Sequence, residues 1–249
     1  MFTDTHCHIY KEYYEDIDGL VNEINESKIN RVINNGVDDK TNKEVLEMLG
    51  KYNFMYGTLG IHPESVEEYT QEDLDFIEEH INDEKIVAIG EIGLDYYWVK
   101  DNKEKQKELF EAQLKLAEKL NKPVVIHSRE ATQDTIEILG KYNVRGVIHS
   151  FSGSYETACI YIKMGFLLGV NGVITFKNCN LKDVISRIDL SNIILETDSP
   201  YLTPVPFRGQ KNDPTHVYDV AKFVADLKGV SVEELSKITN DNIKRVFDI

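Results

Sequence analysis

Residues 86–127 read IVAIGEIGLDYYWVKDNKEKQKELFEAQLKLAEKLNKPVVIH. This stretch is the best guide to the fold, because it contains one complete unit of a pattern that repeats along the whole chain. It begins with a short apolar run at residues 86–90 and ends with a second at 123–127. Between them, at residues 103–120, apolar side chains recur near helical spacing. The stretch therefore predicts a strand, a helix and a second strand.

Six more short runs, rich in apolar and β-branched residues, extend this alternation to both ends of the chain. They cover residues 2–5, 31–35, 54–60, 146–149, 166–170 and 193–197. Eight runs in 249 residues give about 31 residues per strand–helix unit, the density of a (β/α)8 TIM-type barrel. An open doubly wound sheet is the alternative, because alternation alone does not distinguish it from a closed barrel. The count of eight favours an α/β barrel, in one domain over residues 1–249.

Two capping patterns predict where helices begin. Thr70 and Asp73 fit a variant of the capping box, ahead of a helix over residues 71–81. Ser231 and Glu234 fit the box directly and open a final helix that runs toward Val246.

The composition is that of a globular protein, with 41% hydrophobic and 29% charged residues. Three cysteines in a chain of this length exclude a disulfide scaffold and fit a reducing compartment. The first residues carry no basic segment, and no apolar run approaches the roughly 18 residues that span a bilayer. We expect a cytoplasmic protein with no membrane partner.

The charge balance bears on possible partners. With 28 basic against 43 acidic residues the formal net charge is −15. Such a charge repels nucleic acid at long range unless a local cationic site overrides the mean field. The sequence does not specify an oligomeric state, and a monomer is the expectation.

His6 and His8 stand at the end of the first predicted strand. Residues i and i+2 of a strand face the same side, so both imidazoles can enter a barrel and chelate a transition metal there. Asp4 lies below them and is expected to orient one ring, whereas Cys7 faces the other side and is expected to pack. The alternative is a pair of buried histidines satisfied by hydrogen bonds.

Two carboxylates also follow apolar runs. Glu91 comes directly after residues 86–90, and Gly90 and Gly93 beside it indicate a close approach of the backbone. Asp198 follows the run that begins at residue 193. A carboxylate at the end of a buried strand is costly unless it is paired or holds a cation. The alternatives are a salt bridge for Glu91 and a helix cap for Asp198.

His127 and His149 each end a further predicted strand, and either alone is more often a core residue than a ligand. Together the strand ends offer four imidazoles and two carboxylates: His6, His8, Glu91, His127, His149 and Asp198. The carboxyl ends of barrel strands converge on one mouth. The set therefore predicts a binuclear site for divalent ions.

Six motifs occur in one order along the chain. They are Asp4-Thr5-His6-Cys7-His8, Gly60-Ile61-His62-Pro63, Gly90-Glu91-Ile92-Gly93-Leu94-Asp95-Tyr96, Pro123-Val124-Val125-Ile126-His127-Ser128-Arg129, His149-Ser150-Phe151-Ser152-Gly153 and Glu196-Thr197-Asp198-Ser199-Pro200. With them the sequence resembles, from Thr3 to Phe247, the TatD family of metal-dependent deoxyribonucleases, within the amidohydrolase-like metal hydrolases.

The resemblance implies a TIM-type barrel with two divalent metal ions, zinc, magnesium or manganese, at its mouth. The implied ligands are His6, His8 and Asp198 for one ion and His127 and His149 for the other, with Glu91 bridging. His62, Asp95, Arg129 and Arg208 match family positions near the metals or the substrate phosphate. One segment departs from the family pattern, because Lys211 and Asp213 alter the reach of the side chains after Arg208.

The resemblance also implies hydrolysis of DNA phosphodiester bonds by a water activated between the two metals, with Glu91 and Asp198 as the catalytic carboxylates. We expect a 3′–5′ exonuclease on strand ends or single strands, with weak, salt-sensitive DNA binding. Aromatic residues near the mouth are expected either to stack bases or to pack: Tyr96, Tyr97, Trp98 and Phe151.

Two further hypotheses remain open. One is a deacylase that cleaves a carboxyl ester or amide, in an aminoacyl-tRNA or a small metabolite. Related barrels of that kind often bridge their metals with a modified lysine, whereas this chain has Glu91. The other is a non-catalytic metal-binding protein, which the loss of a ligand would indicate.

Overall fold

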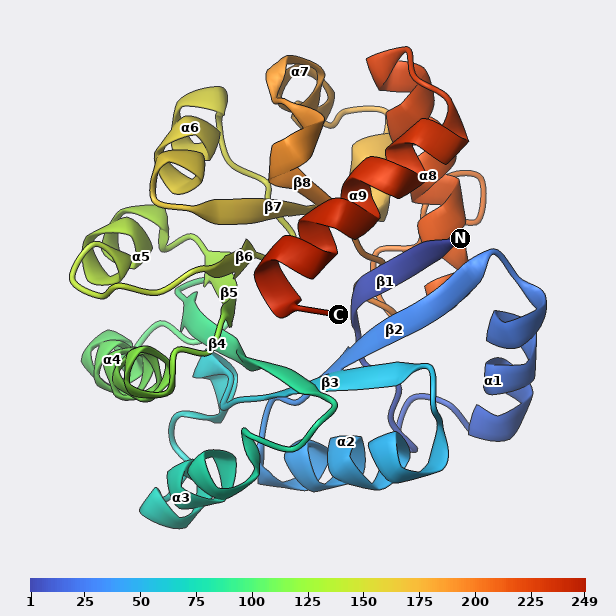
Figure 1. Cartoon of the computed structure of the whole chain (residues 1–249). Helices are drawn as coiled ribbons and strands as arrows, with labels where there is room; N and C mark the ends of the chain where they lie inside the picture. Colours follow the sequence, from blue (N-terminus) through green and yellow to red (C-terminus); the bar gives the residue numbers. More distant parts are fainter.

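The computed structural model describes all 249 residues, and they form an eight-stranded parallel barrel (Figure 1). The strands are β1 (Phe2–Cys7), β2 (Ile29–Asn35), β3 (Met55–Leu59), β4 (Ile86–Asp95), β5 (Val124–Arg129), β6 (Gly146–Ile148), β7 (Phe166–Val170) and β8 (Ile193–Leu195). Each pairs in parallel with the next along the chain. The circle closes at β1 and β8, where the Asp198 N–H donates to the His6 carbonyl at 2.9 Å and the His8 N–H to the Ser199 carbonyl at 2.8 Å. The barrel prediction is confirmed, and the open-sheet alternative is wrong.

Helices surround the barrel (Figure 1). The α-helices are α1 (Ile17–Glu26), α2 (Asp39–Lys51), α3 (Gln71–His80), α4 (Lys103–Leu120), α5 (Thr132–Leu139), α6 (Tyr155–Lys163), α7 (Leu181–Arg187), α8 (Val217–Lys228) and α9 (Val232–Phe247), and the short 3-10 helices are η1 (Pro63–Ser65), η2 (Gly172–Thr175), η3 (Leu190–Asn192) and η4 (Pro214–His216). Both predicted caps are present: Asp73 Oδ2 accepts the Thr70 N–H at 2.6 Å, and the Ser231 hydroxyl accepts the Glu234 N–H at 3.0 Å.

The last helix, α9, closes one end of the barrel, and Figure 1 shows it crossing in front of the strands. Its Ile243, Val246 and Phe247 form a cluster with side chains near the beginnings of the strands, such as Val87 and Val125. Because these contacts lie at the amino-terminal ends of the strands, the carboxyl-terminal ends are left as the open mouth. The larger apolar core lies between the strands and the outer helices.

The fourth strand is longer than predicted, because β4 continues from the predicted end at Gly90 to Asp95. Its polar Glu91 interrupts the apolar run, and therefore the pattern of hydrophobic residues understates the strand. The predicted close approach of the backbone is confirmed at Gly93, which has a φ of +145°; a Cβ there would lie 1.9 Å from the carbonyl oxygen of His127. Glu91 thus lies in mid-strand, with its side chain among those of β1 and β5.

No helix in the structure combines the length and the apolar character that crossing a bilayer requires.

Candidate metal centre

His6 and His8 face the inside of the barrel mouth, as the strand alternation predicts. Their Nε2 atoms lie 3.2 Å apart. The Nδ1 of His8 lies 3.1 Å from the carbonyl oxygen of Asn35, so its N–H is directed away from the centre and Nε2 is free to bind a metal. Cys7 faces the other way, where its thiol donates to the Ile33 carbonyl, and it packs as expected.

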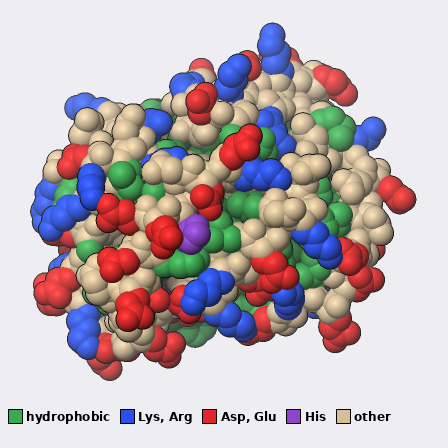
Figure 2. Space-filling view, turned by 60° about the horizontal axis from the view of Figure 1, so that its bottom comes forward, with side chains coloured by type: hydrophobic (Ala, Val, Ile, Leu, Met, Phe, Trp, Pro, Cys, Tyr) green, Lys and Arg blue, Asp and Glu red, His purple; other side chains and the backbone are tan.

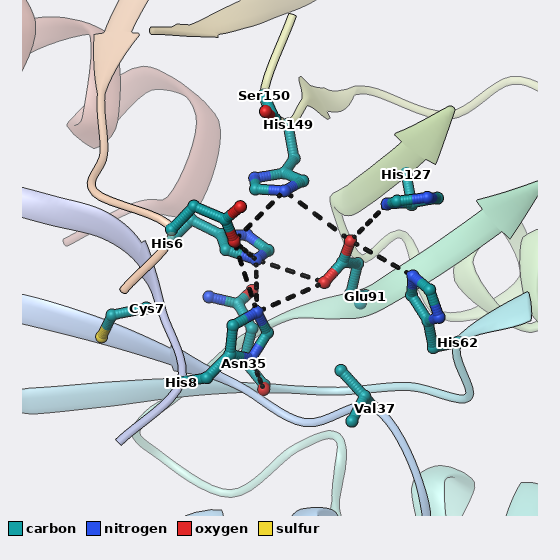
Figure 3. Close-up of polar contacts among 12 residues, drawn as sticks. His6, Cys7, His8, Asn35, Val37, His62, Glu91, His127, His149 and Ser150 are labelled. Atoms are coloured by element: carbon teal, nitrogen blue, oxygen red, sulfur yellow. Dashed lines mark hydrogen bonds and ion pairs between the residues drawn. The ribbon is translucent and has the colours of Figure 1, made fainter. Parts of the chain in front are cut away.

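Glu91 lies at the middle of the cluster, and Figure 3 shows histidines on both sides of its carboxylate. Oε2 lies 3.2 Å from His6 Nε2 and 3.7 Å from His8 Nε2. Oε1 lies 2.8 Å from His127 Nδ1 and 3.8 Å from His149 Nε2. Each carboxylate oxygen therefore faces a different set of imidazoles.

Asp198 joins the cluster from the segment after β8. Its Oδ1 lies 3.6 Å from the Nε2 atoms of both His8 and His149, and 3.8 Å from His6 Nε2. Its φ of 57° is in the left-handed region, which is sparsely populated outside glycine and recurs at functional sites. All six side chains predicted as ligands thus converge at one place, although they come from five separate strand ends.

The chemistry of these donors fits divalent cations. No lysine or arginine pairs with Glu91 or Asp198, whose ion-pair partners are all histidines. Burying two carboxylates without a compensating charge is costly, and a bound cation supplies that charge. Three groups have ligand atoms within 4.8 Å of one another: His6, His8 and Asp198; His62, Glu91 and His127; and His6, His149 and Glu196. Imidazole nitrogens beside carboxylate oxygens suit zinc and other transition ions.

The cluster shifts the pKa values of its members strongly. Burial raises the pKa of Glu91, but the neighbouring His149 and His6 outweigh burial and hold it well below its usual range. Burial lowers the pKa of His127, but Asp95 and Glu91 raise it to about 9. In the same way His149 is raised to about 10 against burial, chiefly by Glu196 and Glu91. Without a metal, the positive charge in the cluster is therefore carried by protons.

His62 differs from the other imidazoles of the cluster. Its Nδ1 accepts the Glu64 N–H at 3.2 Å, so the neutral ring carries its proton on Nε2, which lies 3.6 Å from Glu91 Oε1. Burial and the neighbouring His127 lower the pKa of His62 to about 3, which keeps the ring neutral. A ring nitrogen that carries a proton donates a hydrogen bond rather than binding a metal. The geometry therefore favours His62 as a donor beside the centre.

Asp95 is fully buried behind His127, and this position is not open to a substrate. Its Oδ2 lies 3.0 Å from His127 Nε2, while its Oδ1 accepts the N–H groups of Tyr97 and Trp98 at 2.9 and 2.7 Å. A carboxylate on the outer nitrogen of an imidazole fixes the tautomer and orientation of the ring. The structure thus places Asp95 where it positions His127.

The expectation that Asp4 orients an imidazole is wrong. Its carboxylate accepts the N–H groups of His6 and Thr197 at 3.2 and 2.9 Å and the Thr197 hydroxyl at 2.5 Å, and it contacts no imidazole. The two bonds from Thr197 join β1 to the segment after β8. Asp4 therefore closes the barrel, because its side chain is directed along the seam between the two strands.

Glu196 is the site residue that sequence reasoning missed. Its Oε1 lies 3.0 Å from His149 Nδ1 and accepts the Ser150 N–H at 2.7 Å, while Oε2 is buried without a partner. Gly169 leaves it room, since a Cβ there would lie 2.3 Å from the carboxylate. The available signal was a second carboxylate directly after the apolar run of β8. Glu196 positions His149 as Asp95 positions His127.

The two predicted arginines lie outside the cluster and are exposed. The Arg129 guanidinium lies 4.3 Å from the ring centre of Tyr97, and that of Arg208 lies 4.0 Å from the ring centre of Phe176. Arg187 is the only arginine in an ion pair, so both guanidinium groups are free to meet an anion. The structure does not bring Arg208 into contact with any of the six converging side chains.

Comparisons with known proteins agree with this architecture. The family described as TatD related DNase matches residues 3–248. The uncharacterized metal-dependent hydrolase YabD of Bacillus subtilis is 42% identical over 254 residues, with 100% of both chains covered. The uncharacterized metal-dependent hydrolase YcfH of Escherichia coli is 36% identical over 99% of this chain and 95% of its own.

A solved structure extends the likeness to three dimensions. The TatD homologue YjjV of Escherichia coli superposes with a TM-score of 0.94 at 29% identity, over 100% of this chain and 98% of its own. Because the family match and these relatives cover nearly every residue, including all the motifs at the barrel mouth, the chain belongs to the TatD-related DNase family of metal-dependent hydrolases.

Proposed function

We propose that this protein hydrolyses phosphodiester bonds of DNA, as a 3′–5′ exonuclease on strand ends or single strands, with two divalent cations at the barrel mouth. The observation that supports this most is the Glu91 carboxylate, whose two oxygens face two separate groups of imidazoles. A bridging carboxylate of this kind is what a two-metal site needs. Two cations, when bound, supply Lewis acidity and an activated water for displacement at phosphorus.

The chain's own groups have distinct parts in this proposal. His6, His8 and Asp198 would hold one cation and His127 and His149 the other, with Glu91 shared. Asp198 is the more exposed of the two central carboxylates, with 15% of its side chain exposed against 4% for Glu91. It is therefore the carboxylate that can take a proton from the attacking water. His62, with its proton on Nε2, would donate to a phosphoryl oxygen.

Electrostatics set the strength of DNA binding. On the face seen in Figure 2, lysine and arginine side chains are interspersed with acidic ones, and the whole chain carries −15. Tight binding of a long DNA duplex needs many lysine or arginine side chains that neutralise phosphates, and a surface of mixed charge does not provide them. Arg129 and Arg208 provide local exceptions, since neither is engaged by a carboxylate. Binding is therefore proposed to be weak, local to a strand end, and reduced by salt.

The donor set bears on which metal is bound. Imidazoles outnumber carboxylates in the cluster; imidazole suits zinc, whereas magnesium and manganese prefer oxygen ligands. We propose zinc ahead of manganese and magnesium.

One experiment tests the function directly. Freshly purified protein is incubated with 3′-labelled single-stranded DNA, with duplex DNA and with aminoacylated tRNA, each with zinc, manganese or magnesium and with a chelator. The proposal expects metal-dependent release of nucleotides from the 3′ end of the single strand. Deacylation of the tRNA with intact DNA would instead establish the deacylase, and no turnover of any substrate with any metal would favour a binding protein.

A further inference from the structure

An exposed pair of aromatic rings stands at the rim of the barrel mouth. Trp98 is 62% exposed, more than any other large hydrophobic residue, and Tyr97 is 39% exposed. They contact each other edge to face, with ring centres 4.7 Å apart. Tryptophan is buried in most proteins, and exposing it together with a tyrosine is typical of a binding surface.

Two other aromatic residues near the mouth are excluded as candidates for base stacking because they are buried. Tyr96 is buried and its hydroxyl donates to Asp134 at 2.6 Å. Phe151 is buried against Tyr161. Of the four aromatic residues singled out in the sequence, only Tyr97 and Trp98 have free ring surface.

The pair is held firmly in place by a buried group. The N–H groups of Tyr97 and Trp98 both donate to Asp95 Oδ1, at 2.9 and 2.7 Å. The other oxygen of Asp95 lies 3.0 Å from His127 Nε2. One carboxylate thus holds both the backbone of the aromatic loop and an imidazole of the candidate metal centre, so the loop is adjacent to that centre.

A cation completes the surface. The guanidinium of Arg129 lies 4.3 Å from the ring centre of Tyr97 and 5.3 Å from that of Trp98, and Arg129 pairs with Asp95 in the β4–β5 ladder. It forms no ion pair. The guanidinium lies over the two rings and has no carboxylate partner, and this combination of exposed ring and cation matches a group that carries both an aromatic base and a phosphate. A nucleotide of a single strand presents this combination, whereas the bases of a duplex are already stacked on each other.

We propose that Tyr97, Trp98 and Arg129 form a nucleotide subsite, in which Trp98 stacks on a base of single-stranded DNA and Arg129 binds the adjoining phosphate. This inference rests on the proposed function and adds to it the residues that would recognise an unpaired nucleotide. In this proposal, stacking of a base on Trp98 distinguishes single-stranded from duplex DNA, and the metal centre does not.

The test uses Trp98 itself, because it is the only tryptophan of the chain. Metal-free protein is titrated with short oligothymidine and with an abasic oligonucleotide of equal length, and the tryptophan emission is recorded. Stacking on a base quenches this emission, whereas binding through phosphates alone does not depend on the base. We expect saturable quenching by oligothymidine and little by the abasic strand. Equal responses to the two oligonucleotides would overturn the proposal.

Variants give a second measurement, by fluorescence anisotropy of a labelled oligonucleotide. Trp98→Ala is expected to weaken binding by about 5- to 150-fold, the range that stacking of one base supplies. Trp98→Phe should retain most of the affinity. Phe76→Ala is the matched control, since Phe76 also lies beside a cation, Lys43, but on the outer helices α3 and α2. An affinity of Trp98→Ala equal to that of the control would contradict the subsite.

The two proposals fail in different ways. If the native protein hydrolyses single-stranded DNA but Trp98→Ala keeps the same KM and Trp98 is not quenched, the subsite is wrong and the exonuclease stands. If oligothymidine quenches Trp98 and no metal supports DNA hydrolysis, the subsite stands and the exonuclease is wrong.

Discussion

At the scale of single residues, three imidazoles of the centre have a partner at the ring nitrogen that faces away from the central carboxylates. His8 has the Asn35 carbonyl, His127 has Asp95, and His149 has Glu196. In the neutral ring, each partner keeps the proton on the outer nitrogen, so that the inner nitrogen can bind a metal. The six converging side chains were visible in the sequence, whereas none of these three partners was recognised there as the partner of an imidazole.

Removing a central ligand should abolish hydrolysis without unfolding the protein. For His127→Ala and Asp198→Ala we expect kcat to fall at least about 100-fold, because each loss opens the coordination of a cation or removes the proton acceptor. Steady-state kinetics measures this, and circular dichroism verifies that the barrel persists. Full turnover in either variant would refute the assigned site.

Glu196→Gln should weaken metal binding, although Glu196 faces away from the central carboxylates. The amide keeps the shape but lacks the charge that supports His149, and loss of such a partner typically costs about 10- to 100-fold in metal affinity. Isothermal titration with zinc or manganese measures the change. Glu130→Gln, an exposed glutamate after β5, is the control. A native affinity in Glu196→Gln would show that the 3.0 Å contact with His149 has no role in holding the metal.

At the scale of elements, the barrel is closed by a polar seam between β1 and the segment after β8. Asp4 provides its centre, with bonds from the His6 and Thr197 N–H groups and the Thr197 hydroxyl. The same seam brings His6 and Asp198 together, since the Asp198 N–H donates to the His6 carbonyl at 2.9 Å. Fold closure and site assembly therefore depend on the same few hydrogen bonds.

Asp4→Ala should destabilise the barrel by about 3 kcal/mol, because it leaves buried donors of His6 and Thr197 without an acceptor. Urea unfolding monitored by circular dichroism measures the free energy of unfolding. Glu26→Ala, an exposed position on α1, should change it little. A loss below about 1 kcal/mol in Asp4→Ala would mean that the seam is held by the backbone alone.

At the scale of the whole molecule, metal binding and folding are linked through pH. Without metal, His127 and His149 have pKa values raised to about 9 and about 10 against burial, by Asp95 and Glu91 and by Glu196 and Glu91 respectively. A raised histidine pKa stabilises the fold fully below the unfolded value of about 6.5, and this contribution disappears as the pH rises through the folded values. A cation must displace these protons, so its affinity rises over the same range.

The metal-dependent gain in Tm should therefore grow between pH 6 and pH 9. The metal-free protein loses the charge pairs of its protonated histidines over this interval, while the loaded protein binds its cation more tightly. Thermal unfolding with manganese and with chelator, at several pH values, tests this. Activity should correspondingly fall at acid pH. A Tm gain that is constant with pH would contradict histidine ligation.

The alternation of strands and helices could be read from the sequence alone, as could the six metal-capable side chains at the strand ends, and the count of eight strands favoured a barrel over an open sheet. These features are local: strand and helix periodicity depends on neighbouring residues, and the ability of histidine and carboxylate groups to bind metals is a property of the side chains themselves. For the same reason both capping patterns, at Thr70 and Ser231, could be read directly.

The groups that contact those six side chains from their outer side were determined by the tertiary structure alone. Asp4 meets Thr197, far away in the chain, because the barrel closes; Glu196 reaches His149 because Gly169 of the intervening strand leaves room for it. The tertiary structure also shows which of the four aromatic residues are exposed, namely Tyr97 and Trp98, and which are buried, namely Tyr96 and Phe151. Side-chain direction and burial past the end of a strand depend on the packing of distant segments, and no local pattern contains that information.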